Sequence, residues 1–256
     1  MYLQYIKAAL DAYKRNVMPI LASTLLMFFA MFALVVIALA PLGFTVIKSL
    51  AQGVADQSTI MSTLMASMPT LGFAAIFILL AVIVSISLTA GLTRVYAEAL
   101  RGKTSYKSMI DTAKEKWLTI IGANIIIAVV ISLVVVATAL LSVSLGMLGT
   151  ALLFGVIALL VVFFSYVNQA IVLNNLGAVQ SVKFSYAFAK QNFKDTVLIL
   201  IIFFAANFIL EYALSWAGTV LNVFVLGPLT VIALTALYLD RIKMHSGTKT
   251  KKRRKR

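Results

Sequence analysis

The chain has 256 residues, of which 62% are hydrophobic and only 12% are charged, and its mean hydropathy is +1.04. Soluble domains contain about 45–50% apolar and about 25% charged residues, so this composition excludes an ordinary soluble protein and indicates one embedded in lipid. There is no cysteine, which excludes disulfides and thiolate metal sites. The net charge of +14 would suggest nucleic-acid binding in a soluble protein, but here it has to be interpreted against the membrane segments.

The chain begins with a mixed, basic segment, and an apolar run follows it. That run is longer than the apolar part of a signal peptide, which has about 7–15 residues, so no cleavable leader is expected.

Six apolar segments are long enough to cross a hydrocarbon core, for which about 20 residues are needed. A helix satisfies its own backbone hydrogen bonds in lipid, so each segment is predicted to be a transmembrane helix. The segments are residues 18–47, 70–97, 118–143, 148–174, 196–216 and 217–240. Pro41 in the first and Gly227-Pro228 in the last predict a tilt, a kink or an early helix end at those points.

The loop between the first two spans is the longest of the outer connections. Met61, Leu64, Met65 and Met68 recur there at i, i+3, i+4 and i+7, which predicts an outer interfacial helix.

A short amphipathic pattern occurs three times: IKAALDAYKRNV from Ile6, YKSMIDTAKEKW from Tyr106 and VKFSYAFAKQNF from Val182. Each copy has Lys at its second and ninth positions and ends in a bulky apolar residue. Apolar residues recur along one helical face, and Lys and Arg occupy the opposite faces. A basic helix of this kind lies in the membrane interface, so each copy is expected to be a surface helix that leads into a pair of spans.

The predicted fold is an all-α membrane protein, with six transmembrane helices arranged as three parallel hairpin repeats, each preceded by a cytoplasmic amphipathic helix. The repeats cover about 5–101, 105–177 and 181–243 within one membrane domain, residues 1–247. They are parallel because each unit starts and ends on the same side of the membrane. Residues 248–256 form a like-charge tail that is expected to be disordered.

The basic residues predict the orientation. Of the 22 Lys and Arg residues, all but Lys48 fall on one side of the predicted spans or at the membrane interface on that side. Because cytoplasmic loops carry the excess of Lys and Arg, both termini are expected in the cytoplasm. The chain is therefore predicted to be a multi-pass protein of the plasma or inner membrane.

Two connectors between the spans, Leu100 to Trp117 and Leu176 to Phe193, place a Gly and a Ser before an amphipathic helix and an aromatic residue at the next span. In this layout the chain resembles a superfamily of six-span bacterial and archaeal membrane proteins. That superfamily includes the membrane domain of some glycerophosphodiester phosphodiesterases. The catalytic domain of those enzymes needs His and several acids, so with a single His the resemblance implies no such activity here.

Polar side chains inside spans are costly and are candidates for function. The candidates are Asn124, Asn168, Gln169, Asn207 and Glu211, of which Asn207 and Glu211 share a helical face. They form either helix–helix hydrogen bonds or a substrate or proton site near Glu211. That carboxyl is expected to be protonated if it faces lipid or a dry bundle.

No catalytic motif is present, so no enzymatic activity, cofactor or metal is expected. The lone His245 adjoins the basic tail and is expected to be solvated. The tail is expected to bind anionic lipids, with ribosomal RNA or an acidic partner as the alternative and no DNA; its basic residues are Lys249, Lys251, Lys252, Arg253, Arg254, Lys255 and Arg256.

Two functions remain open. The first is a non-catalytic scaffold or accessory protein that acts through lipid, a membrane-protein partner or the ribosome. The second is a transporter or permease component with a polar site between the repeats. The small number of polar residues in the spans favours the first, and convergence of those residues on one cavity would favour the second.

Overall fold

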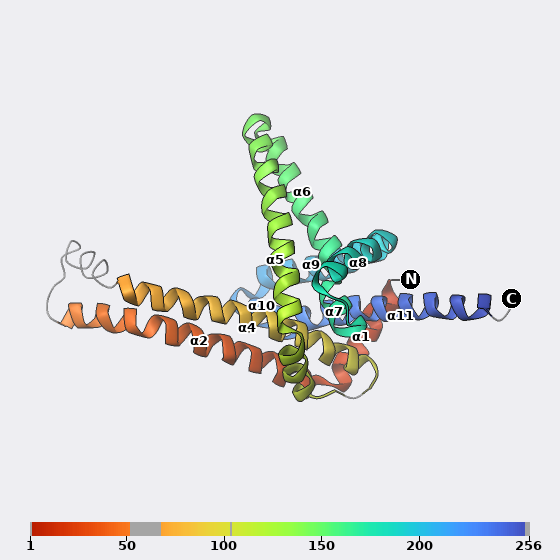
Figure 1. The fold of residues 1–256 in the computed structure, drawn as a ribbon, viewed down its shortest axis with the longest axis horizontal. Coiled ribbons are helices and arrows are strands. Elements are labelled where there is room, and N and C mark those ends of the chain that lie inside the picture. The colour runs from red at the N-terminus through yellow and green to blue at the C-terminus, as the bar shows by residue number, and fades with distance from the viewer. Residues whose placement is uncertain (1, 52–67, 103, 254–256) are drawn as a thin grey trace. The chain divides into compact units, whose positions relative to one another are not determined.

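The computed structural model describes residues 2–51, 68–102 and 104–253, and it is helical, with no strand in those residues (Figure 1). The chain forms two compact units. Unit 1 comprises Met1–Thr24 and Ala90–Arg256, and unit 2 comprises Leu25–Thr89. Each unit is described by itself.

The elements follow one another along the chain as α1 (Leu3–Arg15), α2 (Val17–Ala51), α4 (Met68–Leu100), α5 (Tyr106–Leu145), α6 (Met147–Phe164), α7 (Val167–Asn174), α8 (Ala178–Gln191), α9 (Phe193–Leu214), α10 (Trp216–Leu221), the π-helix η1 (Asn222–Leu226) and α11 (Gly227–Arg253). Within the described ranges, six stretches are long and apolar enough to cross a membrane: Val17–Pro41, Gly72–Leu100, Tyr106–Leu140, Met147–Asn174, Phe193–Leu214 and Trp216–Lys243. The described residues are therefore all-helical apart from short connections, and their six apolar helices are those of a multi-pass membrane protein.

Pro41 does not end the first long helix. Helix α2 continues through it as far as Ala51, so of the tilt, kink or early end expected at this proline, the early helix end is absent. The predicted outer helix around Met61 to Met65 lies outside the described residues. At the other end of the chain, α11 extends to Arg253. The disorder expected for residues 248–256 stays a prediction.

The three amphipathic copies differ in how they join the next span. Helices α1 and α8 end at Asn16 and Asn192, and a new helix starts one residue later. Both asparagines have the same non-helical backbone, with φ of −126° and −113°. In each, the side-chain amide donates to the carbonyl four residues earlier, at 3.0 Å. Asn favours such local bonds over helix continuation.

The second copy is not a separate helix. Helix α5 runs without a break from Tyr106 into the span. The position that holds Asn16 and Asn192 in the other copies is Lys116 here. Lys is a good helix former and has no short amide to compete with the backbone, which explains why the prediction of a distinct surface helix is wrong for this copy.

A serine of helix α8 forms hydrogen bonds to the backbone at the break between α6 and α7. The hydroxyl of Ser185 donates to the carbonyl of Phe163 at 2.7 Å and accepts from the backbone N–H of Tyr166 at 3.1 Å. One buried serine thus satisfies a backbone acceptor and a backbone donor on the two sides of the break.

The weak point expected at Gly227-Pro228 is present as the π-helix η1, which directly precedes α11. Pro228 has no N–H to donate to the carbonyl of Phe224, its ordinary helical acceptor. The hydroxyl of Tyr13 in α1 donates to that carbonyl instead, at 2.9 Å. The proline therefore changes the helix type without ending the last span.

An aromatic cluster forms the core of unit 1. The rings of Tyr166 and Phe188 lie 4.7 Å apart, and those of Phe188 and Tyr238 lie 5.0 Å apart. The hydroxyl groups of Tyr166 and Thr196 share a hydrogen bond of 2.8 Å. The rings come from α8, α11 and the break before α7, and the bonded threonine comes from α9. Away from it, exposed apolar side chains such as Phe29 and Phe32 in unit 2 suit a lipid surface.

Burial recurs at equivalent positions of the three sequence copies. When the copies are aligned on Lys7, Lys107 and Lys183, three sets of side chains are all 0% exposed: Ala9, Met109 and Ser185; Ile20, Ile120 and Thr196; and Ser23, Ala123 and Ile199. When the returning spans are aligned on Tyr96, Val172 and Tyr238, two more sets are 0% exposed: Ala90, Tyr166 and Ile232; and Val95, Ile171 and Leu237.

Gly91 sets the approach of α4 to α5 in unit 1. A Cβ there would lie 2.4 Å from the carbonyl oxygen of Met109 and 2.9 Å from its Cγ. We expect Gly91→Ala to destabilise the fold by about 1–3 kcal/mol, because backbone has to move. The control is Gly72→Ala, where an added Cβ meets nothing within 4 Å. Denaturant unfolding in micelles measures both, and equal stability of the two variants would show that α4 and α5 do not pack at Gly91.

Candidate functional site

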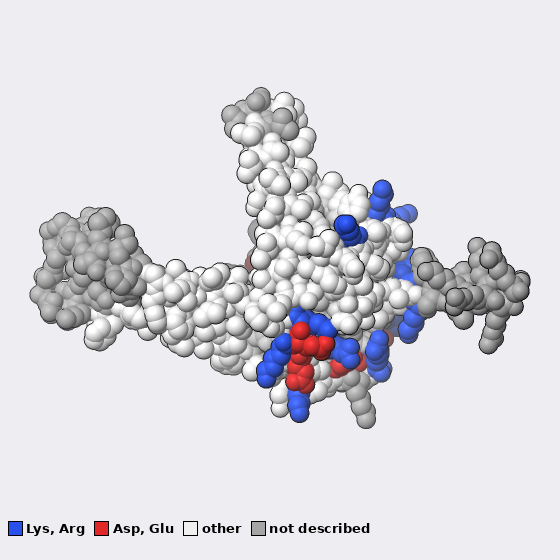
Figure 2. All heavy atoms as spheres, in the orientation of Figure 1, with Lys and Arg blue, Asp and Glu red and all other residues white. Residues whose placement is uncertain are grey.

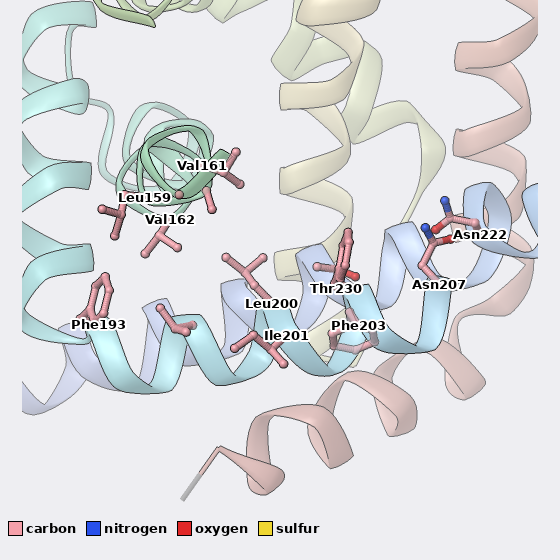
Figure 3. A pocket seen from close by; sticks show the side chains of 14 residues that line it. Leu159, Val161, Val162, Phe193, Leu200, Ile201, Phe203, Asn207, Asn222 and Thr230 are labelled. Carbon is pink, nitrogen blue, oxygen red and sulfur yellow. The ribbon is translucent and has the colours of Figure 1, made fainter. Parts of the chain in front are cut away.

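A groove of about 640 Å³ lies between α6 and α9, and one residue each of η1 and α11 also lines it (Figure 3). It follows α9 from Phe193 to Asn207, which is about 21 Å of helix. The wall formed by α6 consists of Gly155, Ala158, Leu159, Val161 and Val162; the wall formed by α9 consists of Phe193, Val197, Leu200, Ile201, Phe203, Phe204 and Asn207; Asn222 and Thr230 complete the lining.

The groove opens sideways within the membrane-spanning part of the chain. Leu159 and Phe204 on its two walls are 44% and 72% exposed. The α6 wall includes Gly155 and Ala158, and a Cβ added to Gly155 would meet nothing within 4 Å. The groove therefore has open space beside the small side chains of α6. In a bilayer it would face the hydrocarbon core.

One end of this apolar groove is polar. Figure 3 shows the amides of Asn207 and Asn222 together at that end. The hydroxyl of Thr230 is already bonded to the carbonyl of Leu226, at 2.7 Å. The side-chain oxygen of Asn207 is buried and has no hydrogen-bond partner among the described residues. An unpaired buried acceptor costs about 1–3 kcal/mol, so this atom marks a place where a donor is missing.

Gln169 lies in the core of unit 1 and not in the groove. It is only 2% exposed, and its amide nitrogen donates to the hydroxyl of Thr235 at 3.4 Å. Its side-chain oxygen is buried without a partner among the described residues. Thr93, at the equivalent position of the second span, is also buried.

The remaining candidates are dispersed. Asn124 is half-buried and donates to the carbonyl of Ile120 in its own helix, at 2.9 Å. Asn168 is half-buried, and Glu211 is exposed on α9. None of these three lines the groove. The structure thus places Asn207 alone of the five in the groove and does not bring the others to it.

The side chains of the basic tail, from Lys249 to Arg256, lie outside the described part of the structure. Among the side chains that are described, no three His, Asp or Glu residues come close enough together to hold a metal ion.

A second, charged cleft of about 460 Å³ lies between the end of α4, the start of α5 and α7. Its lining includes Arg94, Glu98, Asp111, Lys116 and Asn175. Sequence reasoning did not single out this set, because its members lie on three separate helices. The available signal was the i, i+4 spacing of Arg94 and Glu98, which form an ion pair at 2.8 Å.

Polar contacts hold the basic helix ends of unit 1 together. The hydroxyl of Tyr5 in α1 donates to the carboxylate of Asp240 in α11 at 2.8 Å. Burial is the larger cause, and this hydrogen bond the smaller one, of a pKa of Tyr5 that lies above its usual value. Arg241 donates to Asp195 of α9, also at 2.8 Å. The first contact joins α1 to α11 across 235 residues of sequence, and the second joins α11 to α9.

No family model matches this chain, and no match was found among curated proteins or solved structures.

Tyr5→Phe removes only the hydroxyl that bonds Asp240. We expect it to lower the free energy of unfolding by about 1 kcal/mol, measured by denaturant titration in micelles. Because the pKa of Tyr5 is raised in the folded state, its contribution is complete below about pH 10 and is lost as the pH rises through the folded pKa. The variant should therefore lose less stability than the parent chain in strong alkali.

The matched control is Tyr2→Phe, because Tyr2 has no side-chain hydrogen bond in the described structure. If both variants unfold alike, the Tyr5–Asp240 bond does not hold α1 to α11.

Proposed function

We propose that this chain is a non-catalytic scaffold or accessory protein of the membrane, and that it holds a transmembrane helix of a partner in the groove between α6 and α9. The observation that supports this most directly is the unpaired oxygen of Asn207 at the end of an otherwise apolar groove. Small residues on one wall, Gly155 and Ala158, suit the close approach of a helix backbone.

The unpaired acceptor favours a helix over a lipid tail as the occupant. An acyl chain fills apolar volume but has no hydrogen-bond donor. A transmembrane helix with a Ser, Thr, Asn or Gln side chain supplies both the apolar surface and the donor. Asn207 would then select among helices, because a partner without a donor leaves its buried oxygen unsatisfied.

We further propose three parallel repeats of a surface helix and two spans, with the basic helix ends and both termini in the cytoplasm of a plasma or inner membrane. The buried side chains at equivalent positions support the repeat. The excess of Lys and Arg at the same helix ends supports the orientation and contact with anionic lipid. We also propose, from this layout, that the chain is a member of the six-span superfamily that it resembles.

The groove is tested by photo-crosslinking in intact membranes. With a photoreactive amino acid in place of Ile201, we expect adducts with one membrane protein, and mass spectrometry should place the crosslink in one of its transmembrane helices. Gly155→Leu, which fills the groove, should remove the adduct. Asn207→Leu should weaken it about tenfold, as expected for one lost buried hydrogen bond.

Gly72→Leu is the control, since Gly72 also has open space around it but lies in unit 2. Stability separates this function from a structural role: Asn207→Leu should leave the free energy of unfolding unchanged or higher, because it removes an unpaired polar atom. Adducts with lipid alone, or adducts that Gly155→Leu does not affect, would refute the proposal.

The buried, unpaired oxygen of Gln169 beside the break between α6 and α7 favours a transporter as the second candidate. Proteoliposomes with an entrapped pH-sensitive dye test it. Under an applied membrane potential, a transporter of this kind gives a proton or ion flux that Gln169→Leu or Glu211→Gln abolishes. A flux equal to that of empty liposomes eliminates this candidate.

A further inference from the structure

We propose that the charged cleft between α4, α5 and α7 binds a phosphate ester that carries a primary ammonium group, which is the headgroup chemistry of phosphatidylethanolamine. The proposal rests on the cleft alone and is independent of any partner in the groove. The cleft offers unused donors for the phosphate on one side and unused carboxylate oxygens for the ammonium on the other.

Arg94 provides the first part of the anion site. Its Nε donates to one carboxylate oxygen of Glu98 at 2.8 Å, and the hydroxyl of Ser108 donates to the other oxygen at 2.8 Å. Both oxygens of Glu98 are therefore occupied. The two terminal nitrogens of Arg94 have no partner in the described structure. A guanidinium held by its Nε presents these nitrogens as a fork that matches a phosphate.

Lys116 provides the second part. Its side chain is only 18% exposed, and its Nζ lies 2.5 Å from Glu115 Oε1 and 2.5 Å from Asn175 Oδ1. A lysine ammonium has three N–H donors, so one remains after these two contacts. Two fixed acceptors hold Nζ at the lining of the cleft.

The carboxylates provide the ammonium site. Asp111 is exposed, and its carboxylate forms no hydrogen bond or ion pair within the described structure. The second carboxylate oxygen of Glu115 is also without a partner there. With Glu98, the cleft has three acids against two bases. An excess of acids disfavours a purely anionic ligand, whereas a zwitterion that places an ammonium beside Asp111 complements both signs.

The position of the cleft suits a lipid headgroup. Arg94 lies near the end of the span Gly72–Leu100, and Val172 and Leu173 of α7 add apolar lining. Trp117, the residue after Lys116, is 45% exposed, and Trp is enriched where spans meet the headgroups. Figure 2 shows Asp and Glu side chains gathered among Lys and Arg on one patch of the surface, over the start of α5.

The test uses the full chain in nanodiscs of phosphatidylcholine, into which phosphatidylethanolamine or phosphatidylglycerol with the same acyl chains is titrated. Native mass spectrometry counts the lipids that stay bound. Phosphatidylglycerol reports the general attraction of the basic helix ends for anionic lipid. We expect phosphatidylethanolamine to be retained about tenfold more strongly than phosphatidylcholine, since only the former brings both a phosphate and N–H donors. Arg94→Gln and Asp111→Asn should each reduce that preference about tenfold.

Each variant has a matched control. For Arg94→Gln it is Arg101→Gln, which removes an exposed arginine directly after α4 and outside the cleft. For Asp111→Asn it is Asp11→Asn, at the equivalent position of the first amphipathic copy. Both should keep the preference. If Arg94→Gln fails to fold, Asp111→Asn still decides, because its carboxylate holds nothing in the described structure.

Soluble phosphoethanolamine distinguishes the source of the ligand. If the free compound protects the chain from thermal unfolding as well as the lipid does, the cleft recognises a soluble metabolite of the same chemistry. If it protects only weakly, the ligand is the lipid. Equal retention of phosphatidylethanolamine and phosphatidylcholine, or a preference that Asp111→Asn leaves intact, would overturn the proposal.

Discussion

Hydrocarbon offers no hydrogen bonds to an open backbone, and the helix breaks of unit 1 show how a membrane-spanning chain meets that constraint. At Asn16 and Asn192 the side chain of the break residue itself bonds the preceding turn. Between α6 and α7 the bond comes from Ser185 on another helix. At Pro228 it comes from Tyr13, so packing of α1 against the last span is also what satisfies the backbone there.

Some buried side-chain atoms, in contrast, have no hydrogen-bond partner in the described structure. Asn207 and Gln169 each leave one buried oxygen unpaired in the described structure, and they do so in different places. The charged cleft is different, because its ions are mostly paired and the unused donors and acceptors belong to groups already fixed in position. A groove that lacks a donor and a cleft that holds spare charges of both signs suit different ligands, and one chain can hold both.

Hydropathy and length alone predicted the six spans, because crossing a bilayer requires a minimum apolar length. The amphipathic pattern could not predict which copies form separate helices, since that depends on one residue outside the pattern, Asn16 or Asn192 against Lys116. Residue type gave the polar candidates, but their grouping depends on how the helices pack. Asn207 lines the groove, whereas Glu211, one turn further along α9, is exposed and does not. The cleft joins residues 94, 111, 116 and 175, and no local spacing reveals such a set.

The bond between Tyr13 and Phe224 also bears on the order of biosynthesis. Its partners are 211 residues apart, so α1 is made well before Phe224 and cannot form this contact until η1 has been made. At about 5–20 residues per second, translation leaves α1 without its final partner for about 10–40 seconds. Docking of α1 is therefore a late assembly step, completed only after the last span has been inserted.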